Sequence, residues 1–540
     1  MKRCPTCQRV YADESLNFCR HDGATLVSDS SPITAELPPT IPKLVPVSSS
    51  AAVASEPAHT SSSLTMPVVR KRRGKPKAID SLAVLPITNA GADQQMEYLS
   101  DGITDSIINS LSQLPKLRVV PRSSVFRYKG DQSDPLEIGR VLGVRAVVTG
   151  RLLQVGDLLV VRAELIDVDQ ESQLWGEEYR RGQGDVFTIQ EEISQEISGK
   201  LRVRLSAEAK KRLAKRFTEN TDAYHFYLKG RYYTNKRTTD WIKKGIQHFQ
   251  QAIELDPKYA LAYAGLADAF AFLASSTGEC RPDDWYPKAK AAASKALELD
   301  EGLAEAHTSL GFSRLLYDWN FAEGEREFKR AIELNPAYAN AHDGYSFYLK
   351  AAGQHEKAIG ECTDAQKLDP LSLFANVSLG WAYYFARQYD QAIEQHRKAL
   401  EMDPQFTFAN WNLGMAYAQQ NKMDKAIQAL EQADAHSGGG LTFKAHLGYV
   451  RALAGQRDEA QQIITELKEL TPRRYMSPYY FAIVHLGLGE IDQAIDYLKS
   501  AYEERSGFMT FIKVEPMLDP LRSDPRFIEL ENSVGAISSD

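Results

Sequence analysis

Long apolar runs are absent from this sequence of 540 residues. No segment approaches the roughly 18–20 consecutive apolar residues that a membrane-spanning helix needs. The N-terminal stretch that begins Met-Lys-Arg-Cys-Pro has no apolar core of a secretory signal. Cysteine is also scarce: the chain has five, and three of them lie close together at the N-terminus, which is not the pattern of a disulfide framework. We therefore expect a cytoplasmic protein of a reducing compartment.

Catalytic motifs are missing as well. The sequence has no Walker loop, no His-Glu-x-x-His, no Gly-x-Ser-x-Gly elbow and no set of kinase loops. Asp101 and Asp105 lie one helical turn apart and could form a carboxylate pair, but a polar face near a helix start is the simpler interpretation. Arg122 with the two serines that follow it is a weak candidate for contact with an anion. We predict that the protein is not an enzyme.

An overall excess of positive charge is also lacking. The formal net charge is −7, which argues against nucleic-acid binding along the whole chain. Residues 28–78 are rich in Ser, Pro and Ala and have almost no aromatic residues, so we expect a disordered linker. It ends in six cations within residues 70–77. This basic end is either a solvated linker end or a contact site for nucleic acid or acidic lipid.

The N-terminal segment, residues 1–27, contains cysteines spaced like the ligands of a metal ion. Cys4 and Cys7 form a Cys-x2-Cys pair, Cys19 follows, and His21 and Asp22 come soon after it. Thiolates at this spacing suit tetrahedral zinc. The segment resembles a truncated zinc ribbon, and we expect one structural zinc held by the three cysteines and by Asp22 or His21. The alternative is that no metal binds.

Residues 79–206 alternate between strand and helix patterns. We predict strands at 81–87 and 117–120, helices at 94–114 and 135–142, a hairpin of 146–153 with 158–167, a strand at 172–181 and a helix at 185–204. Such alternation predicts an α/β layer in which helices cover a small mixed sheet.

This α/β region resembles a known bacterial family. Four segments carry the resemblance: Ala-Val-Leu-Pro at 83–86, Tyr-Leu-Ser-Asp-Gly-Ile-Thr at 98–104, Leu-Arg-Val-Val-Pro-Arg-Ser-Ser at 117–124 and Leu-Trp-Gly-Glu at 174–177. They occur in the order and spacing of the TolB amino-terminal-like domain. The resemblance implies a non-catalytic interaction domain of a bacterial protein, commonly followed by helical repeats and a capping tail. Relatives often carry a kinase, cyclase or winged-helix output domain, and we do not transfer the activities of those domains.

One fixed period dominates the rest of the chain. It is kept by Pro336, Pro370 and Pro404, by Gly380, Gly414 and Gly448, and by Ala358, Ala392, Ala426, Ala460 and Ala494. Small residues at two phases and a helix-breaking proline at a third indicate helix-turn-helix repeats. The pattern from Asn376 through Leu-Gly to Pro404 resembles the tetratricopeptide (TPR) family. The predicted fold is therefore multidomain: a zinc-ribbon-like module, an α/β domain, an all-α TPR solenoid of about eight repeats over 220–506, and a cap over 507–540.

The resemblance to TPRs also suggests a binding site. Positions 2, 5, 9, 12 and 13 of the first helix of each TPR line a concave groove, and here they are unusually aromatic. The candidate peptide-binding residues are Phe374, Trp381, Tyr384, Phe385, Phe408, Trp411 and Met415. An exposed apolar patch of this kind marks a binding surface. The alternative is that neighbouring helices, or the chain's own tail, already cover it.

Two functions are consistent with these features. We expect a bacterial cytoplasmic scaffold or adaptor that binds a protein or peptide partner in the TPR groove. The alternative is a nucleic-acid-associated regulator that uses the zinc-ribbon-like segment and the basic run, with the TPRs as ligand sensor. Peripheral membrane contact through the basic run is a third possibility.

Overall fold

The computed structural model describes residues 79–91, 96–114, 117–131, 133–201, 217–275 and 280–535, together with three short strands near the N-terminus. The chain divides into two units, residues 1–73 and 74–540. In the first unit, β1 (Lys2–Arg3) pairs antiparallel with β2 (Val10–Tyr11) and with β3 (Val27–Ser28). The predicted zinc ligands lie outside the described residues.

The second unit begins with a mixed sheet. Its strands are β4 (Ser81–Val84), β5 (Thr88–Asn89), β6 (Arg118–Val119), β7 (Ala146–Val155), β8 (Leu158–Asp167) and β9 (Ser172–Gly182), in the order β6-β4-β7-β8-β9, with β5 paired to β7. The pairs β4–β6, β4–β7 and β5–β7 are parallel, whereas β7–β8–β9 is an antiparallel meander. The predicted mixed sheet is confirmed, and its hairpin turns at Gly156, as expected.

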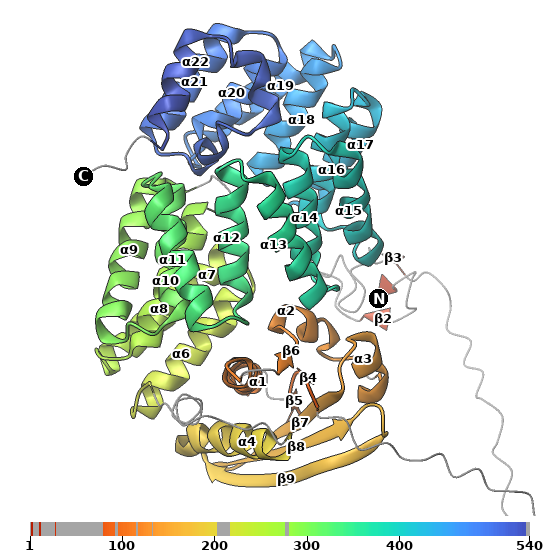
Figure 1. The fold of residues 1–540 in the computed structure, drawn as a ribbon, viewed down its shortest axis with the longest axis vertical. Coiled ribbons are helices and arrows are strands. Elements are labelled where there is room, and N and C mark those ends of the chain that lie inside the picture. The colour runs from red at the N-terminus through yellow and green to blue at the C-terminus, as the bar shows by residue number, and fades with distance from the viewer. Residues whose placement is uncertain are drawn as a thin grey trace, which may run out of the picture. The chain divides into compact units, whose positions relative to one another are not determined.

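One face of this sheet is covered by helices. Along β8, every second side chain is buried and those between them are partly or fully exposed, which is typical of an antiparallel sheet with one packed face. Helices α1 (Glu97–Ser112) and α4 (Val186–Lys200) pack on the buried side, and Figure 1 shows α4 lying along β8 and β9. The short helices α2 (Arg122–Val125), η2 (Phe126–Tyr128), α3 (Pro135–Val141) and η3 (Gln183–Asp185) complete the domain.

Helices α6 to α21 follow as successive antiparallel pairs (Figure 1). Their bounds are α6 Thr221–Thr234, α7 Thr239–Leu255, α8 Ala260–Ser275, α9 Pro282–Leu299, α10 Ala304–Leu316, α11 Phe321–Leu334, α12 Ala339–Ala351, α13 His355–Leu368, α14 Leu373–Phe385, α15 Tyr389–Met402, α16 Thr407–Gln419, α17 Met423–His436, α18 Leu441–Leu453, α19 Arg457–Leu470, α20 Pro478–Gly487 and α21 Ile491–Glu503. Even-numbered helices from α6 to α20 are the first members of each pair and odd-numbered helices the second. The result is a solenoid of helical repeats, as predicted.

One position of each second helix fills the space between neighbouring first helices. Phe249 of α7 lies between Gly230 of α6 and Gly265 of α8, where an added Cβ would come within 2.6 Å of its ring from either side. Phe328 of α11 lies in the same way beside Gly311 of α10. In the four repeats that follow Phe328, the equivalent buried position holds Cys362, His396, Leu430 and Ile464. Small residues at the facing positions therefore set how closely the helices pack.

The turn inside each pair also recurs with the repeat. A residue just after the first helix has a positive φ in six consecutive pairs: Trp319, Gly353, Arg387, Asn421, Gly455 and Gly489. The N–H of the next residue bonds back into the helix, as Gln456 does to the Arg451 carbonyl at 2.9 Å. This is the Schellman-type helix end, which favours glycine because only glycine adopts positive φ without a Cβ clash.

After α21 the chain folds back on the solenoid. It forms η4 (Gly507–Phe511), η5 (Pro516–Leu521) and α22 (Pro525–Ser533), and its apolar side chains Met509, Ile512, Leu518, Leu521 and Phe527 are buried. Among the residues that the structure describes, no helix is both long enough and apolar enough to cross a lipid bilayer.

The helix-end turns predict opposite effects for two glycine substitutions. Gly455→Ala places a Cβ in open space but at φ +82°, so we expect it to destabilise the protein by about 1 kcal/mol. Gly360→Ala lies inside α13, also in open space, and should stabilise by about 0.5–1 kcal/mol. Urea unfolding of both variants measures the two changes in the free energy of unfolding. Changes of the same sign would contradict the assignment of the turn.

A second prediction concerns His396. This side chain is fully buried, neither ring nitrogen has a hydrogen-bond partner among the described residues, and burial lowers its pKa to about 3. The unfolded chain takes up a proton near pH 6.5 and the folded chain does not, so stability falls by about 1.4 kcal/mol for each pH unit from about 6.5 to 3.

His396→Leu copies Leu430 of the next repeat and removes both the orphaned nitrogens and the titration. We expect about 1–2 kcal/mol of added stability at pH 7 and a larger difference at pH 5. Unfolding free energies of variant and wild type at both pH values test this. A difference that does not grow on acidification would show that the imidazole is protonated in the folded protein.

Candidate functional site

The predicted aromatic groove residues lie on α14 and α16 but differ widely in exposure. Phe374 is 59% exposed, and Trp381, Phe408 and Trp411 are half-buried. Three others are buried, Tyr384 at 3%, Phe385 at 1% and Met415 at 4% exposure. The expected patch is therefore not one continuous exposed surface, and it separates into a covered part and an open part.

The covered part is occupied by the chain's own C-terminal segment. The Phe511 ring of η4 lies 5.1 Å from Phe385 in a stacked arrangement and 5.0 Å from both Trp381 and Phe347 (centroid distances). Aromatic side chains at predicted groove positions thus contact a phenylalanine ring. The ring belongs to the same chain, which is the alternative left open above.

Polar contacts fix the same segment. The Tyr384 hydroxyl donates to Glu515 Oε1 at 2.7 Å, and burial raises the pKa of this carboxyl to about 6. Arg387 donates to the Val514 carbonyl at 2.7 Å and pairs with Asp519 at 2.9 Å. Buried polar groups that are matched in this way set the register of the segment on the helices.

The open part is a cluster that we call the aromatic rim: Phe374, Phe406, Phe408, Trp411 and Phe443. Phe374 contacts Phe406 at 5.2 Å and Phe408 at 5.8 Å between ring centroids, and Trp411 contacts Phe443 at 5.8 Å. None of the five rings is buried. The sequence prediction missed Phe406 and Phe443, because Phe406 belongs to the turn after Pro404 and Phe443 occupies a position that does not usually line the groove.

The opposite end of the solenoid is polar. Arg231 of α6, Asp268 of α8, Glu305 of α10 and Asn340 of α12 line a small pocket of about 30 Å³ together with Tyr338. This volume holds little more than a water molecule. The first helix pairs therefore offer no apolar cavity for a partner at this point.

Asp101 and Asp105, the candidate carboxylate pair, are engaged by cations. Lys129 contacts Asp101 at 2.6 Å, Arg122 contacts Asp105 at 3.2 Å, and Arg231 of α6 contacts the other oxygen of Asp105 at 2.9 Å. The pair thus joins α1 of the α/β domain to the first solenoid helix. Its carboxylates are held in ion pairs, which gives them a structural role.

The serines of the Arg-Ser-Ser motif also contact the solenoid. Ser124 and Ser123 donate to the carboxylate of Asp369, and Arg127 donates to the Leu371 carbonyl at 2.6 Å. Asp369 and Leu371 lie between α13 and α14, four pairs away from α6 in the chain. The motif therefore binds an anion of this same chain, a buried aspartate.

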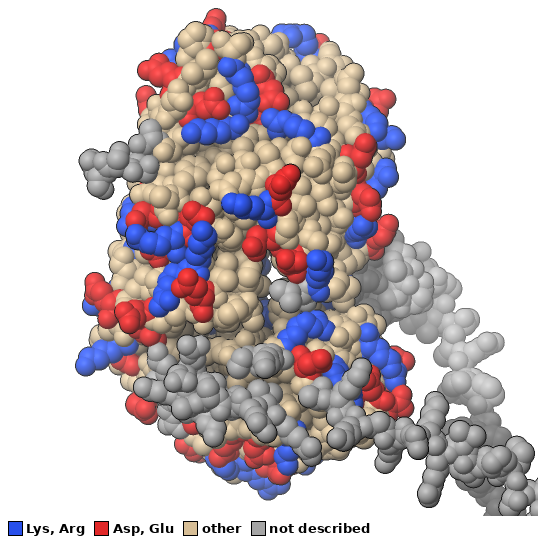
Figure 2. Space-filling view, viewed as in Figure 1, with Lys and Arg blue, Asp and Glu red and all other residues tan. Residues whose placement is uncertain are grey.

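Metal-ligand groups add no site over the described ranges, and the charges on the face seen in Figure 2 are mixed. No group of three or more His, Cys, Asp or Glu side chains there is arranged to hold a metal ion. Figure 2 shows Lys and Arg intermingled with Asp and Glu, without an extended area of one sign among the described residues of this face. A broad polyanion would find no continuous complementary surface on that face.

The covered part of the groove generates a stability prediction. Phe511→Ala removes a 5%-exposed ring from a three-ring contact, so we expect a loss of about 3 kcal/mol. Phe374→Ala, the matched control with a 59%-exposed ring, should cost less than about 1 kcal/mol. Guanidinium unfolding followed by tryptophan fluorescence measures both, and equal losses would contradict the anchoring of Phe511.

Comparison with known families identifies two regions. Residues 77–196 match the model of the HilA/YgeH-like transcriptional regulator, second domain, and residues 377–440 match the model of the tetratricopeptide repeat. The chain is 31% identical to the Rhizobium meliloti protein named "Putative adenylate cyclase 3" over 43% of this chain and 40% of that one. It is 25% identical to the transcriptional regulator HilA of Salmonella typhimurium over 56% of this chain and 54% of that one.

The chain thus spans about half or less of the length of these curated relatives. Among solved structures, the TPR protein YrrB, described as having an unusual peptide-binding site, is 23% identical over 35% of this chain and 91% of that one, with a TM-score of 0.26. The family model and the helix pairs agree over the middle of the solenoid. Residues 377–440 match the tetratricopeptide repeat, and the helical repeats of the solenoid are TPR-like.

Proposed function

We propose that this protein is a non-catalytic bacterial scaffold or adaptor of the cytoplasm that binds a protein partner through its TPR solenoid. TPR folds are typical of interaction proteins. The observation that supports the site is the aromatic rim, where Phe374 is 59% exposed at the edge of four further half-buried rings. Clustered aromatic side chains with partial exposure are characteristic of interaction hot spots.

Contacts between the rings make the rim a pre-organised surface. Phe408 contacts Phe374, Phe406, Trp411 and Phe443 with centroid distances of 5.8 to 6.3 Å. Rings held by one another lose little side-chain entropy when a partner binds. An apolar or aromatic side chain of a partner peptide would bury the Phe374 face and the edges of its neighbours.

The neighbouring α/β domain supplies a second contact in this proposal. Arg127 lies against Leu371, three residues before Phe374, so a partner on the rim would be adjacent to η2. We assign the domain to the TolB amino-terminal-like type on the sequence motifs described above. The N-terminal module would add a third contact, folded around one structural zinc bound by Cys4, Cys7 and Cys19 with Asp22 or His21.

A second candidate function has specific support. Residues 77–196 match the second domain of a family of transcriptional regulators, and HilA itself is similar over 56% of this chain. The chain could then be a nucleic-acid-associated regulator that contacts nucleic acid through its zinc-ribbon-like segment and basic run. Retention of nucleic acid that weakens steeply with salt and depends on the cations of residues 70–77 would favour this function over the scaffold.

The rim proposal predicts the effect of a double substitution. Phe374→Ser with Trp411→Ala removes the exposed ring and the central indole, so we expect partner affinity to fall at least about tenfold. Ile528→Ser is the matched control, because Ile528 is 41% exposed on α22 and lies outside the rim. This control variant should keep its affinity for the partner within about twofold of the wild-type value.

Partners are recovered by affinity capture from native extract with wild type and both variants, and the affinity of each recovered protein is then measured with purified components. Circular dichroism confirms that both variants fold. A partner bound equally by wild type and the double variant would remove the rim from the interface and transfer the interaction to the α/β domain or the N-terminal module.

A further inference from the structure

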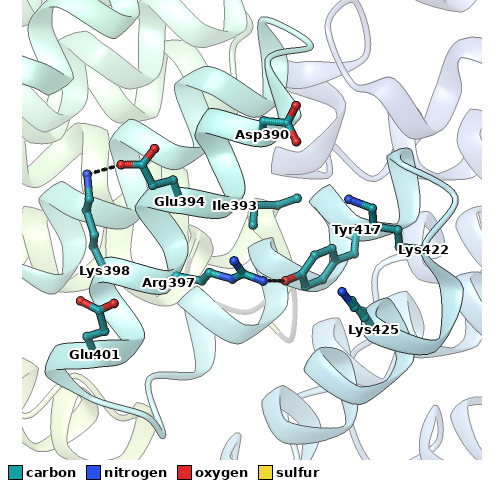
Figure 3. Close-up of a pocket in the computed structure, with 9 residues that line it drawn as sticks. All are labelled: Asp390, Ile393, Glu394, Arg397, Lys398, Glu401, Tyr417, Lys422 and Lys425. Carbon is teal, nitrogen blue, oxygen red and sulfur yellow. Dashed lines mark hydrogen bonds and ion pairs between the residues drawn. The ribbon is translucent and has the colours of Figure 1, made fainter.

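A second site lies on the outer surface of the solenoid, away from the aromatic rim. A pocket of about 450 Å³ is formed by α15, the start of α17 and Tyr417 of α16 (Figure 3). Its lining is mostly charged: Asp390, Ile393, Glu394, Arg397, Lys398, Glu401, Tyr417, Lys422 and Lys425. The volume is ample for a small ligand.

The cations of this pocket differ in how they are engaged. Lys398 is paired with Glu394 on the same helix at 2.7 Å. Arg397, Lys422 and Lys425 form no ion pair with a carboxylate among the described residues. In Figure 3 these three lie on the side of Tyr417, whereas the Lys398–Glu394 pair lies across the pocket. Three cations of the pocket thus lack a carboxylate partner within the described part of the chain, and Lys422 donates to the side-chain oxygen of Gln420 at 2.6 Å.

One of these cations, Arg397, contacts the hydroxyl of a buried tyrosine, Tyr417. Tyr417 is 6% exposed, and its oxygen accepts a hydrogen bond from Arg397 Nη2 at 2.6 Å. Because the oxygen accepts from arginine, its own proton is available to donate, and no acceptor for it occurs within the described part of the chain. Arg397 Cζ and Lys425 Nζ each lie 5.9 Å from the centroid of the Tyr417 ring. Arg397 thus contacts the hydroxyl directly, and Lys425 lies near the ring of the same tyrosine.

Two carboxylates limit what this pocket can accept. Asp390 accepts from Gln420 at 2.8 Å, and Glu401 lies at the far end of the lining. Either would repel an extended polyanion that ran along α15. A compact anion with several oxygens can reach Arg397, Lys425 and the Tyr417 hydroxyl without approaching these carboxylates. The lining thus favours a small oxyanion.

The repeat architecture does not require these cations. The position of Arg397 is occupied by Thr363 in the preceding repeat and by Glu431 in the following one. The position of Lys425 is occupied by Gln391 and Glu459 in the same way. The cluster occurs where α15 meets the start of α17, at one junction between two repeats, so it is not a general feature of how the helices pack.

We propose that this pocket binds a compact oxyanion of the phosphate type, either free phosphate or a phosphoryl group carried by a peptide. The Arg397 guanidinium offers charge-assisted hydrogen bonds in a planar fork, Lys422 and Lys425 add charge, and the Tyr417 hydroxyl donates from the pocket floor. The site is independent of the aromatic rim, and its presence does not depend on the scaffold function.

Calorimetric titration of the full chain with inorganic phosphate, and separately with phosphoserine, tests this at constant ionic strength. We expect saturable binding at one site and at least about tenfold weaker binding by Arg397→Gln. Tyr417→Phe keeps the ring and removes the hydroxyl, both its proton and the oxygen that accepts from Arg397, so a decrease of about three- to tenfold is expected. Lys329→Gln is the control, because Lys329 forms the same kind of ion pair with Glu325 on α11 but does not line the pocket, and its phosphate affinity should stay within about twofold of wild type.

The two probes distinguish the sources. Tighter binding of inorganic phosphate indicates a free ion, and tighter binding of phosphoserine indicates a phosphorylated peptide. Thermal unfolding of each variant confirms folding before titration. Non-saturable uptake by wild type, or a loss in Lys329→Gln equal to that in Arg397→Gln, would overturn the proposal, because either result reflects charge attraction without a built site.

Discussion

The insertion of one large side chain between the small residues of neighbouring helices is the constraint on which the solenoid depends. Phe249 fills the space between Gly230 and Gly265, and Phe328 repeats the arrangement beside Gly311. The equivalent buried position of later second helices holds Cys362, His396, Leu430 and Ile464, so the size of the inserted side chain varies while each pair is still positioned by the pair before it. Direction and spacing along the whole array follow from this single local fit.

The same fit explains where sequence reasoning succeeded. The regular recurrence of Gly380, Gly414 and Gly448 predicts close helix packing without reference to distant contacts, because the packing partners are adjacent in the chain. The α/β domain was predictable for a related reason. Residues along its strands are either uniformly apolar or alternate between apolar and polar, so the hairpin of β7 and β8 could be placed with its turn at Gly156. Two short elements, β5 and α2, were missed because such short segments carry no periodicity.

The candidate site was predictable only in part, since exposure depends on contacts that are remote in sequence. Tyr384 and Phe385 occupy groove positions by phase, yet Phe511 and Glu515 cover them from the C-terminal end of the chain. No local pattern indicates where a tail will fold back. Phe374 and Phe408 also occupy groove positions by phase, and within the described part of the chain no such segment covers them. The outer pocket around Tyr417 was not predicted, because its cations come from two different helices and a turn.

The two attachments of the α/β domain bear on how the solenoid can move. An array in which each helix pair contacts only its neighbours can bend, because small changes in orientation between successive pairs add along its length. Here Asp105 holds Arg231 on the first helix, while Ser123 and Ser124 hold Asp369 four pairs further on. The α/β domain therefore connects two separated positions of the solenoid. Bending of the helices between them requires one attachment to break, so the curvature of this half of the array and the integrity of the α/β domain contacts are mechanically coupled.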